Sequence, residues 1–344
     1  MIVGQDKAVD AFASAWQTRR LHHAWLLAGP KGVGKARFAR AAATRVLADA
    51  AGPAITEPGL ETPPEHPMAR LMVAGSHPDF RWLERLEKDK GGLARNISVD
   101  QVRSLGDLLG VTPSMSPWRA IVIDSVDDLE ASAANALLKM LEEPPANTLF
   151  FLVSHAPGRL LATIRSRCRR LDFGKLPDDA MTSLLSRSLP ETNSSEIERL
   201  VKFANGSAGR ALGIAELDLA PLESEVLTIL RQGDPDNARR SKLASALGSK
   251  AAADRYAAFL DLVPGLIAGE ALGLDGEARG RALDAYAKAR ETAAIAPRLS
   301  LDPAATVFQL GTILASVAPE AGNEVDPSSF VIPGSNRGAT AAFP

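Results

Sequence analysis

The sequence predicts an α/β domain built around a parallel sheet, followed by smaller all-helical parts. Short apolar runs alternate with helix-compatible segments over the first half of the chain, which is typical of a parallel sheet covered by helices on both faces. The run Gly29-Pro-Lys-Gly-Val-Gly-Lys-Ala36 lies between one such strand and a helix. After Gly174 the strand-like runs stop, and segments rich in Ala and Leu indicate helices only.

The composition of the 344 residues is that of a folded protein with two or three domains. Apolar residues make up 46% of the chain and aromatic residues 5%, which favours helical packing over a large β-sandwich. The formal net charge of −2 excludes a chain that attracts nucleic acid as a whole. Any DNA contact must therefore be local or shared with partner subunits.

Cysteine content and hydropathy exclude several classes of protein. Cys168 is the only cysteine, so disulfide frameworks and cysteine-based zinc sites are excluded. Residues 1–14 contain charges and no long apolar core, so no signal peptide is expected. No apolar run approaches the length of a membrane span. We therefore expect a cytoplasmic protein without a membrane partner.

The first half contains five predicted strands separated by helices. Its central strands are short continuous apolar runs, as expected for strands buried on both faces. Ser98 or Asp100 can cap one helix, and Pro144 ends another. Residues 51–67, rich in Pro, Gly and Thr, predict an irregular surface insertion. In order, we expect helix 6–19, strand 24–28, helix 37–48, strand 79–83, helix 99–109, strand 120–124, helix 131–143, strand 149–153, a short helix starting in 160–164 and a last strand at 170–173.

The second half is predicted to contain three short helices and then a longer helical region. The short helices are expected at 178–188, 194–204 and 210–218, the last after the turn-forming stretch 205–209. Residues 222–318 fit helices throughout, and residues 320–344 have the composition of a disordered tail. The predicted domains are a nucleotide-fold domain at 1–174, a helical lid at 175–218, a helical oligomerisation domain at 219–319 and the tail at 320–344.

The glycine-rich run has the spacing G-x-x-x-x-G-K of a phosphate-binding P-loop. Its glycines let successive N–H groups face a phosphate, and Lys35 and the following helix N-terminus add positive charge. The next residue should be a Ser or Thr that binds Mg²⁺, but it is Ala36. Two interpretations stay open, a nucleotide site for ATP or ADP and a loop kept only as a structural turn. The candidate binding residues in the loop are Gly29, Lys31, Gly32, Val33, Gly34, Lys35 and Ala36.

A second motif of nucleotide-binding proteins is also incomplete. Asp124 ends an apolar strand, where an Asp helps to hold Mg²⁺ in hydrolysing P-loop enzymes. The next residue in many of them is a Glu that orients water, but here it is Ser125. Asp127 and Asp128 are expected to cap the following helix. Because Ala36 and Ser125 both lack the expected group, competent ATP hydrolysis is not expected.

Three further positions admit both a functional and a structural interpretation. Ser154, after the third apolar strand, can touch a γ-phosphate or be a turn serine. Arg210 can reach back to a nucleotide or be exposed. Arg167 belongs to an arginine-rich segment that can supply an arginine to a neighbour's nucleotide, although charge alone favours a solvated helix end. The five histidines have no metal-ligand spacing, so no metal site is expected.

Four motifs together resemble those of bacterial clamp-loader subunits of DNA polymerase III, which are AAA+ proteins, and in particular their delta-prime group. They are Val3-Gly4-Gln5, the P-loop after His22-His23-Ala24-Trp25, Asn135-Ala-Leu-Leu-Lys-Met-Leu-Glu-Glu-Pro-Pro145 and Ser166-Arg-Cys168. The resemblance is strong over about residues 1–215. It implies a RecA-like domain, a helical lid and a helical collar that assembles five subunits into a ring.

The resemblance also implies a function. The ring contains ATPase subunits of the gamma/tau type and a delta subunit, and it opens a sliding clamp and places it on primed DNA during DNA replication. Arg167 matches an arginine that faces the ATP of the adjacent ATPase subunit, and Arg210 matches the arginine of the lid. No zinc is expected, because residues 49–79 lack the cysteines of the ATPase relatives. A non-hydrolysing or weakly nucleotide-binding subunit without independent catalysis is thus expected.

Two other functions remain as alternatives. The first is a catalytically active AAA+ clamp-loader ATPase of the gamma/tau type, which Ala36, Ser125 and the absence of a tau-like extension disfavour. The second is a stand-alone nucleotide-binding regulator, which is disfavoured because Arg167 needs a partner's site.

Overall fold

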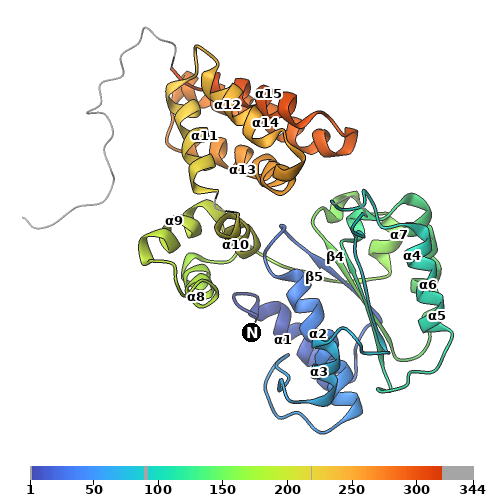
Figure 1. Cartoon of the computed structure of the whole chain (residues 1–344). Helices are drawn as coiled ribbons and strands as arrows, with labels where there is room; N and C mark the ends of the chain where they lie inside the picture. The colour runs from blue at the N-terminus through green and yellow to red at the C-terminus, as the bar shows by residue number, and fades with distance from the viewer. Residues whose placement is uncertain (1, 89–91, 218, 320–344) are drawn as a thin grey trace, which may run out of the picture. The chain divides into compact units, whose positions relative to one another are not determined.

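The computed structural model describes residues 2–88, 92–217 and 219–319. The chain forms two compact units that divide after Ala220 (Figure 1). The first unit contains the sheet and the three short helices that follow it, and the second contains helices. The tail predicted at 320–344 lies outside the described residues.

The first unit is built on a five-stranded, fully parallel sheet in the order β2-β3-β4-β1-β5. The sheet confirms the predicted fold class. Ala28, at the end of β1, pairs with Ser154 of β4 and Asp172 of β5, so the carboxyl ends of these strands meet at one edge. The strands are β1 Ala24–Ala28, β2 Phe80–Leu83, β3 Arg119–Asp124, β4 Thr148–Ser154 and β5 Arg169–Asp172.

Helices cover both faces of this sheet, with α1 to α3 on one side and α4 to α7 on the other (Figure 1). Alternate residues of β1 enter different cores: Trp25 packs with Phe12 and Phe38, whereas Leu26 packs with the residues around α6. The helices are α1 Asp6–Gln17, α2 Lys35–Ala51, α3 Pro67–Val73, α4 Val99–Arg103, α5 Leu105–Leu109, α6 Ala131–Glu142 and α7 Ala162–Ser166.

One local prediction was wrong, and one helix was not predicted. The single helix expected at 99–109 is two helices, α4 and α5, which divide at Ser104. The Ser104 hydroxyl donates to the carbonyl of Gln101 at 2.7 Å, a local bond that competes with continuous helix geometry. The helix α3, which was not predicted, begins at Pro67, the last residue of the segment predicted to be irregular. The His66 side chain caps it by accepting from the N–H of Met68.

Three short helices complete the first unit: α8 Asp178–Ser188, α9 Ser194–Ala204 and α10 Ala208–Glu216. We call this segment, residues 175–217, the lid. Asn205 and Gly206 end α9 with positive φ angles of 48° and 78°. Ser207 then caps α10, so that this helix starts two residues before the predicted Arg210.

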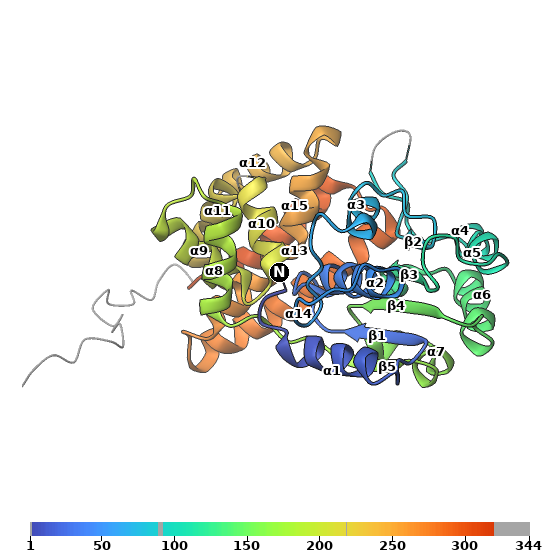
Figure 2. The same cartoon turned by 90° about the horizontal axis from the view of Figure 1, so that it is seen from below.

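The second unit contains helices only over its described residues, as predicted. They are α11 Ala220–Gln232, α12 Ala238–Leu247, α13 Ala253–Ala271, α14 Gly276–Leu299 and α15 Pro303–Ala315, and Figure 2 shows them from below. Phe259, Val263 and Leu310 are among its fully buried side chains. Among the described residues of the whole chain, no helix has both the length and the apolar character needed to cross a membrane.

Candidate functional site

The predicted P-loop curls between β1 and α2, at the carboxyl edge of the sheet. Gly32 and Gly34 adopt positive φ angles of 79° and 99°, which side-chain-bearing residues rarely adopt. Gly34 is the N-cap of α2, and the first N–H bonded within this helix is that of Phe38, to the carbonyl of Gly34. The N–H groups of the first helical turn therefore stand at the loop, as in phosphate-binding helix N-termini.

Every carbonyl oxygen from Gly29 to Gly34 accepts a hydrogen bond from another group of the protein. The donors come from four parts of the first unit: the N-terminal segment, the loop's own lysine, helix α2 and the lid. They are Lys35 Nζ to Gly29 and Pro30, Ser207 Oγ to Lys31, Gly209 N to Gly32, Gln5 Nε2 to Val33 and Phe38 N to Gly34. The loop is therefore held in shape by protein contacts alone.

The lid contributes two of these contacts. Ser207 Oγ lies 3.0 Å from the Lys31 carbonyl, and the Gly209 N–H donates to Gly32 at 2.9 Å. A Cβ atom added to Gly32 would lie 2.2 Å from Ser207 Oγ. Glycine is thus required at position 32 for contact with the lid as well as for its φ angle. Arg210 lies in the same first turn of α10, next to this contact.

Gln5 explains the Val3-Gly4-Gln5 motif in physical terms. Its side-chain amide donates to Val33 in the P-loop and, at 2.9 Å, to the Gly174 carbonyl directly before the lid. Sequence analysis quoted this motif but missed the contacts of Gln5, Ser207 and Gly209. The signal for Gln5 was a polar residue within a recognisable motif, whereas nothing in the local sequence indicated the contacts made by Ser207.

Lys35 is buried, with 2% of the residue exposed. Its ammonium donates to the carbonyls of Gly29 and Pro30 at 2.7 and 2.5 Å. Burial lowers the pKa of Lys35 from its usual 10.5 to about 8, against the opposing attraction of Asp124 and Asp127. The cation expected to face a phosphate is therefore bonded to the loop itself.

The carboxylates beyond β3 form a network of their own. Burial raises the pKa of Asp124, helped by the nearby Glu84 and opposed by Lys35. Ser125 Oγ donates to Asp128 at 3.0 Å. This hydroxyl stands where hydrolysing relatives of the fold carry a carboxylate, and it is bonded to a neighbouring side chain.

Asp127 and Asp128 do not cap the following helix, contrary to prediction. They lie in a 3₁₀ turn, Val126–Asp128, and the N-cap of α6 is Glu130. The Asp127 carboxylate instead accepts from Ser154 Oγ at 2.9 Å and from the His155 N–H at 2.5 Å. Asp127 thereby joins the ends of β3 and β4, and the fully buried Ser154 is already engaged by it.

The residues present fit a phosphate better than a Mg²⁺ ion. A helix N-terminus, a curled glycine loop and Lys35 converge at the edge of the sheet, which is the chemistry that binds phosphates. At position 36 the methyl group of Ala has no oxygen to offer a metal. Among the described residues, no group of three or more His, Cys, Asp or Glu side chains could hold a metal ion.

Arg167 lies outside the P-loop, as the C-cap of α7. Its side chain is 33% exposed, and its guanidinium bonds Glu142 Oε1 of α6 at 2.6 Å and the Thr163 carbonyl at 2.9 Å. The neighbouring arginines are used differently: Arg165 donates to Pro157 and Gly158, Arg169 lies over the Trp25 ring, and Arg170 pairs with Asp172.

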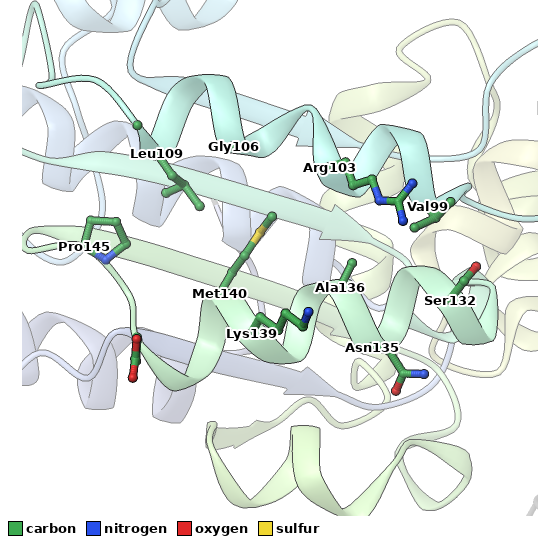
Figure 3. Close-up of a pocket in the computed structure, with 12 residues that line it drawn as sticks. Val99, Arg103, Gly106, Leu109, Ser132, Asn135, Ala136, Lys139, Met140 and Pro145 are labelled. Atoms are coloured by element: carbon green, nitrogen blue, oxygen red, sulfur yellow. The ribbon is translucent and has the colours of Figure 1, made fainter.

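A groove of about 730 Å³ lies between α4, α5 and α6 (Figure 3). Helix α6 carries most of the motif at residues 135–145, and its two faces differ. Leu137 and Leu141 are buried in the core, whereas Asn135, Lys139 and Met140 line the groove. Burial in the core therefore accounts for only part of the motif at residues 135–145.

The fold and the site together define a P-loop protein with a parallel α/β nucleotide-fold domain, in which Ala36 and Ser125 stand where a metal ligand and a water-orienting carboxylate are usual. The family model described as "DNA polymerase III, delta subunit" matches residues 4–177, half of the chain. The chain belongs to this family.

The curated relatives that this chain resembles include delta-prime subunits. The chain is 36% identical over 188 residues to the DNA polymerase III subunit delta' of Pseudomonas aeruginosa, covering 54% of this chain and 53% of the relative. It is 32% identical over 215 residues to the subunit delta' of Escherichia coli, covering 61% and 59%. A DNA polymerase III subunit gamma of Buchnera aphidicola is 30% identical over 219 residues, covering 62% and 56%. The chain thus spans little more than half the length of these three relatives.

Proposed function

We propose that this chain is a clamp-loader subunit of the replicative DNA polymerase that does not hydrolyse ATP itself and supplies Arg167 in trans to a neighbouring ATPase subunit. The observation that carries the proposal is the paired defect at the nucleotide site. Ala36 offers no metal ligand, and Ser125 is bonded to Asp128. Hydrolysis needs both a positioned metal and a positioned water, and here neither has its usual protein group.

Arg167 supports the second half of the proposal. It belongs to the Ser166-Arg-Cys168 motif, and a third of its side chain is exposed. An arginine supplied in trans is worth ~10³–10⁵ in rate at the site that receives it. A subunit can therefore serve hydrolysis by its neighbour without hydrolysing ATP itself.

The experiment is a steady-state ATPase assay on the isolated chain with Mg²⁺. We expect turnover at background, equal to that of a Lys35→Ala control. A robust Mg²⁺-dependent turnover that disappears in Lys35→Ala would instead favour the alternative, an active ATPase of the gamma/tau type. Titration with a fluorescent ATP analogue, with and without Mg²⁺, separates a loop that binds ATP or ADP from one that is structural.

The second unit is proposed to be the collar that joins this chain to gamma/tau-type and delta-type partners in a five-subunit ring, which acts on a sliding clamp and primed DNA. Exposed apolar side chains on it, at Leu272, Leu283 and Leu299, support an interface. A chain ending near residue 220 should lose ring assembly while its first unit, which has its own cores, stays folded. Entry of the truncated chain into the complex with unchanged affinity would contradict the assignment.

A further inference from the structure

The arginine of the proposed function, Arg167, is partly exposed and is held in one orientation by its own chain. Two of its terminal nitrogens are used: Nη2 donates to Glu142 Oε1 at 2.6 Å, and Nη1 donates to the Thr163 carbonyl at 2.9 Å. A guanidinium carries five N–H donors. These two bonds therefore fix the plane of the group and leave further donors for an incoming anion.

Glu142 is in an unfavourable place for an acid unless it has a counter-charge. It is the last residue of α6, where the helix dipole is negative and a carboxylate is disfavoured. Its side chain is 47% exposed, so packing in a core does not account for it. The guanidinium of Arg167 supplies the counter-charge across the space between α6 and α7.

Stability is also a weak explanation for this pair. An exposed ion pair contributes a median of about 0–1 kcal/mol, because solvent screens it and two long side chains lose freedom. The same loss of freedom is useful if the arginine must be ready for a ligand. An arginine side chain carries ~2 kcal/mol of rotamer entropy, and holding it in place beforehand lowers the cost of binding.

We propose that Glu142 is a positioning residue, which holds the Arg167 guanidinium toward the nucleotide of the neighbouring subunit. The inference rests on the proposed function, in which Arg167 acts in trans. Glu142 acts as a hydrogen-bond acceptor whose side chain has the right length to reach the guanidinium. Its charge is secondary, since a carboxylate beside the guanidinium weakens the attraction of Arg167 for phosphate. Glu142 therefore affects the neighbour's site through the orientation of the Arg167 guanidinium and not through its own charge.

The test measures ATPase activity of the complex reconstituted with gamma/tau-type and delta-type partners. Arg167→Ala sets the full loss of activity that this chain can cause. We expect Glu142→Ala to give at least half of that loss. Glu142→Gln should stay within about twofold of wild-type activity, because it keeps an acceptor at the same distance from the backbone. Glu142→Asp should lose activity, because its side chain is one methylene shorter. Glu143→Ala, an exposed neighbour in the same run, is the matched control and should equal wild type.

A double-mutant cycle distinguishes a positioning role from an independent one. Adding Glu142→Ala to Arg167→Ala should cause no further loss, because Glu142 acts only through Arg167. Native mass and thermal unfolding check that every variant assembles and folds. If Glu142→Ala equals or exceeds wild type in ATPase activity while Arg167→Ala loses activity, the inference is overturned and the proposed function stands. The same holds if Glu142→Asp equals or exceeds wild type together with Glu142→Ala. If Arg167→Ala itself equals wild type, the proposed function fails.

Discussion

The two cationic sites of the first unit use their charges in opposite ways. Lys35 is buried, and its ammonium is bonded to two carbonyls of its own loop, whereas the side chain of Arg167 is one-third exposed and anchored at one edge only. The first arrangement gives two of the three ammonium donors to the fold. The second gives two of the five guanidinium donors to the fold and so leaves more of them for another molecule. The difference teaches that a P-loop motif can also serve as a junction between parts of the fold, and under the proposed function the residue that acts on a nucleotide is Arg167.

Position 32 sharpens this comparison most, because it tests whether the P-loop is a junction. Gly32→Ala should destabilise the protein by about 1–3 kcal/mol, since the added Cβ meets Ser207 Oγ at 2.2 Å at a φ of +79°. Gly34→Ala is the matched control, because its φ is +99° but no atom lies within 4 Å of the added Cβ. Chemical denaturation of both variants isolates the lid contact. Equal losses would mean that the lid contact contributes nothing.

Ser207 should show a smaller effect of the same kind. Its hydroxyl donates to Lys31 in the loop, and its side chain caps α10. Ser207→Ala should cost about 1 kcal/mol, the scale of one hydrogen bond or one helix cap. The exposed Ser186 of the same lid serves as the control, with a change within ±0.5 kcal/mol for Ser186→Ala. Two indistinguishable denaturation midpoints would contradict the junction.

Much of the fold could be predicted from the sequence, and the correctly predicted elements are those that local patterns determine. The apolar run at 24–28 became β1 without change, and helices α8 and α9 begin and end at the predicted residues. Such elements need only their own periodicity and caps. The division at Ser104 and the helix from Pro67 were missed, because single side-chain bonds decide them.

The candidate site divides in the same way. The loop residues, Asp124 and Ser154 could be predicted to meet, because parallel strands present their carboxyl ends at one edge. The bond between Ser207 and Lys31 joins residues 176 positions apart, and no local pattern encodes it. The role of Asp127 was predicted wrongly for the same reason, since its partner Ser154 belongs to another strand.

The smallest expected effect is the pH dependence of stability that the buried Lys35 causes. The pKa of Lys35 is about 8 in the folded state against 10.5 ordinarily, so between these values the unfolded chain binds more protons and the free energy of unfolding rises with pH. Lys35→Met should remove this rise. The difference between wild type and variant is the proper measure, because burial raises the pKa of Cys168 to about 12 and makes its own contribution fall above pH 9.0. A difference that stays flat from pH 8 to 10.5 would contradict the assignment.

The most direct test of the central claim places both cations in the same assembled complex. ATPase activity is measured for the loader reconstituted with wild type, Lys35→Ala or Arg167→Ala, after native mass has shown equal assembly and thermal unfolding an intact fold. We expect Lys35→Ala to hydrolyse ATP within about twofold of wild type and Arg167→Ala to lose the share of one site, since a trans arginine is worth ~10³–10⁵ there. The reverse pattern, loss with Lys35→Ala and wild-type hydrolysis with Arg167→Ala, would contradict the account.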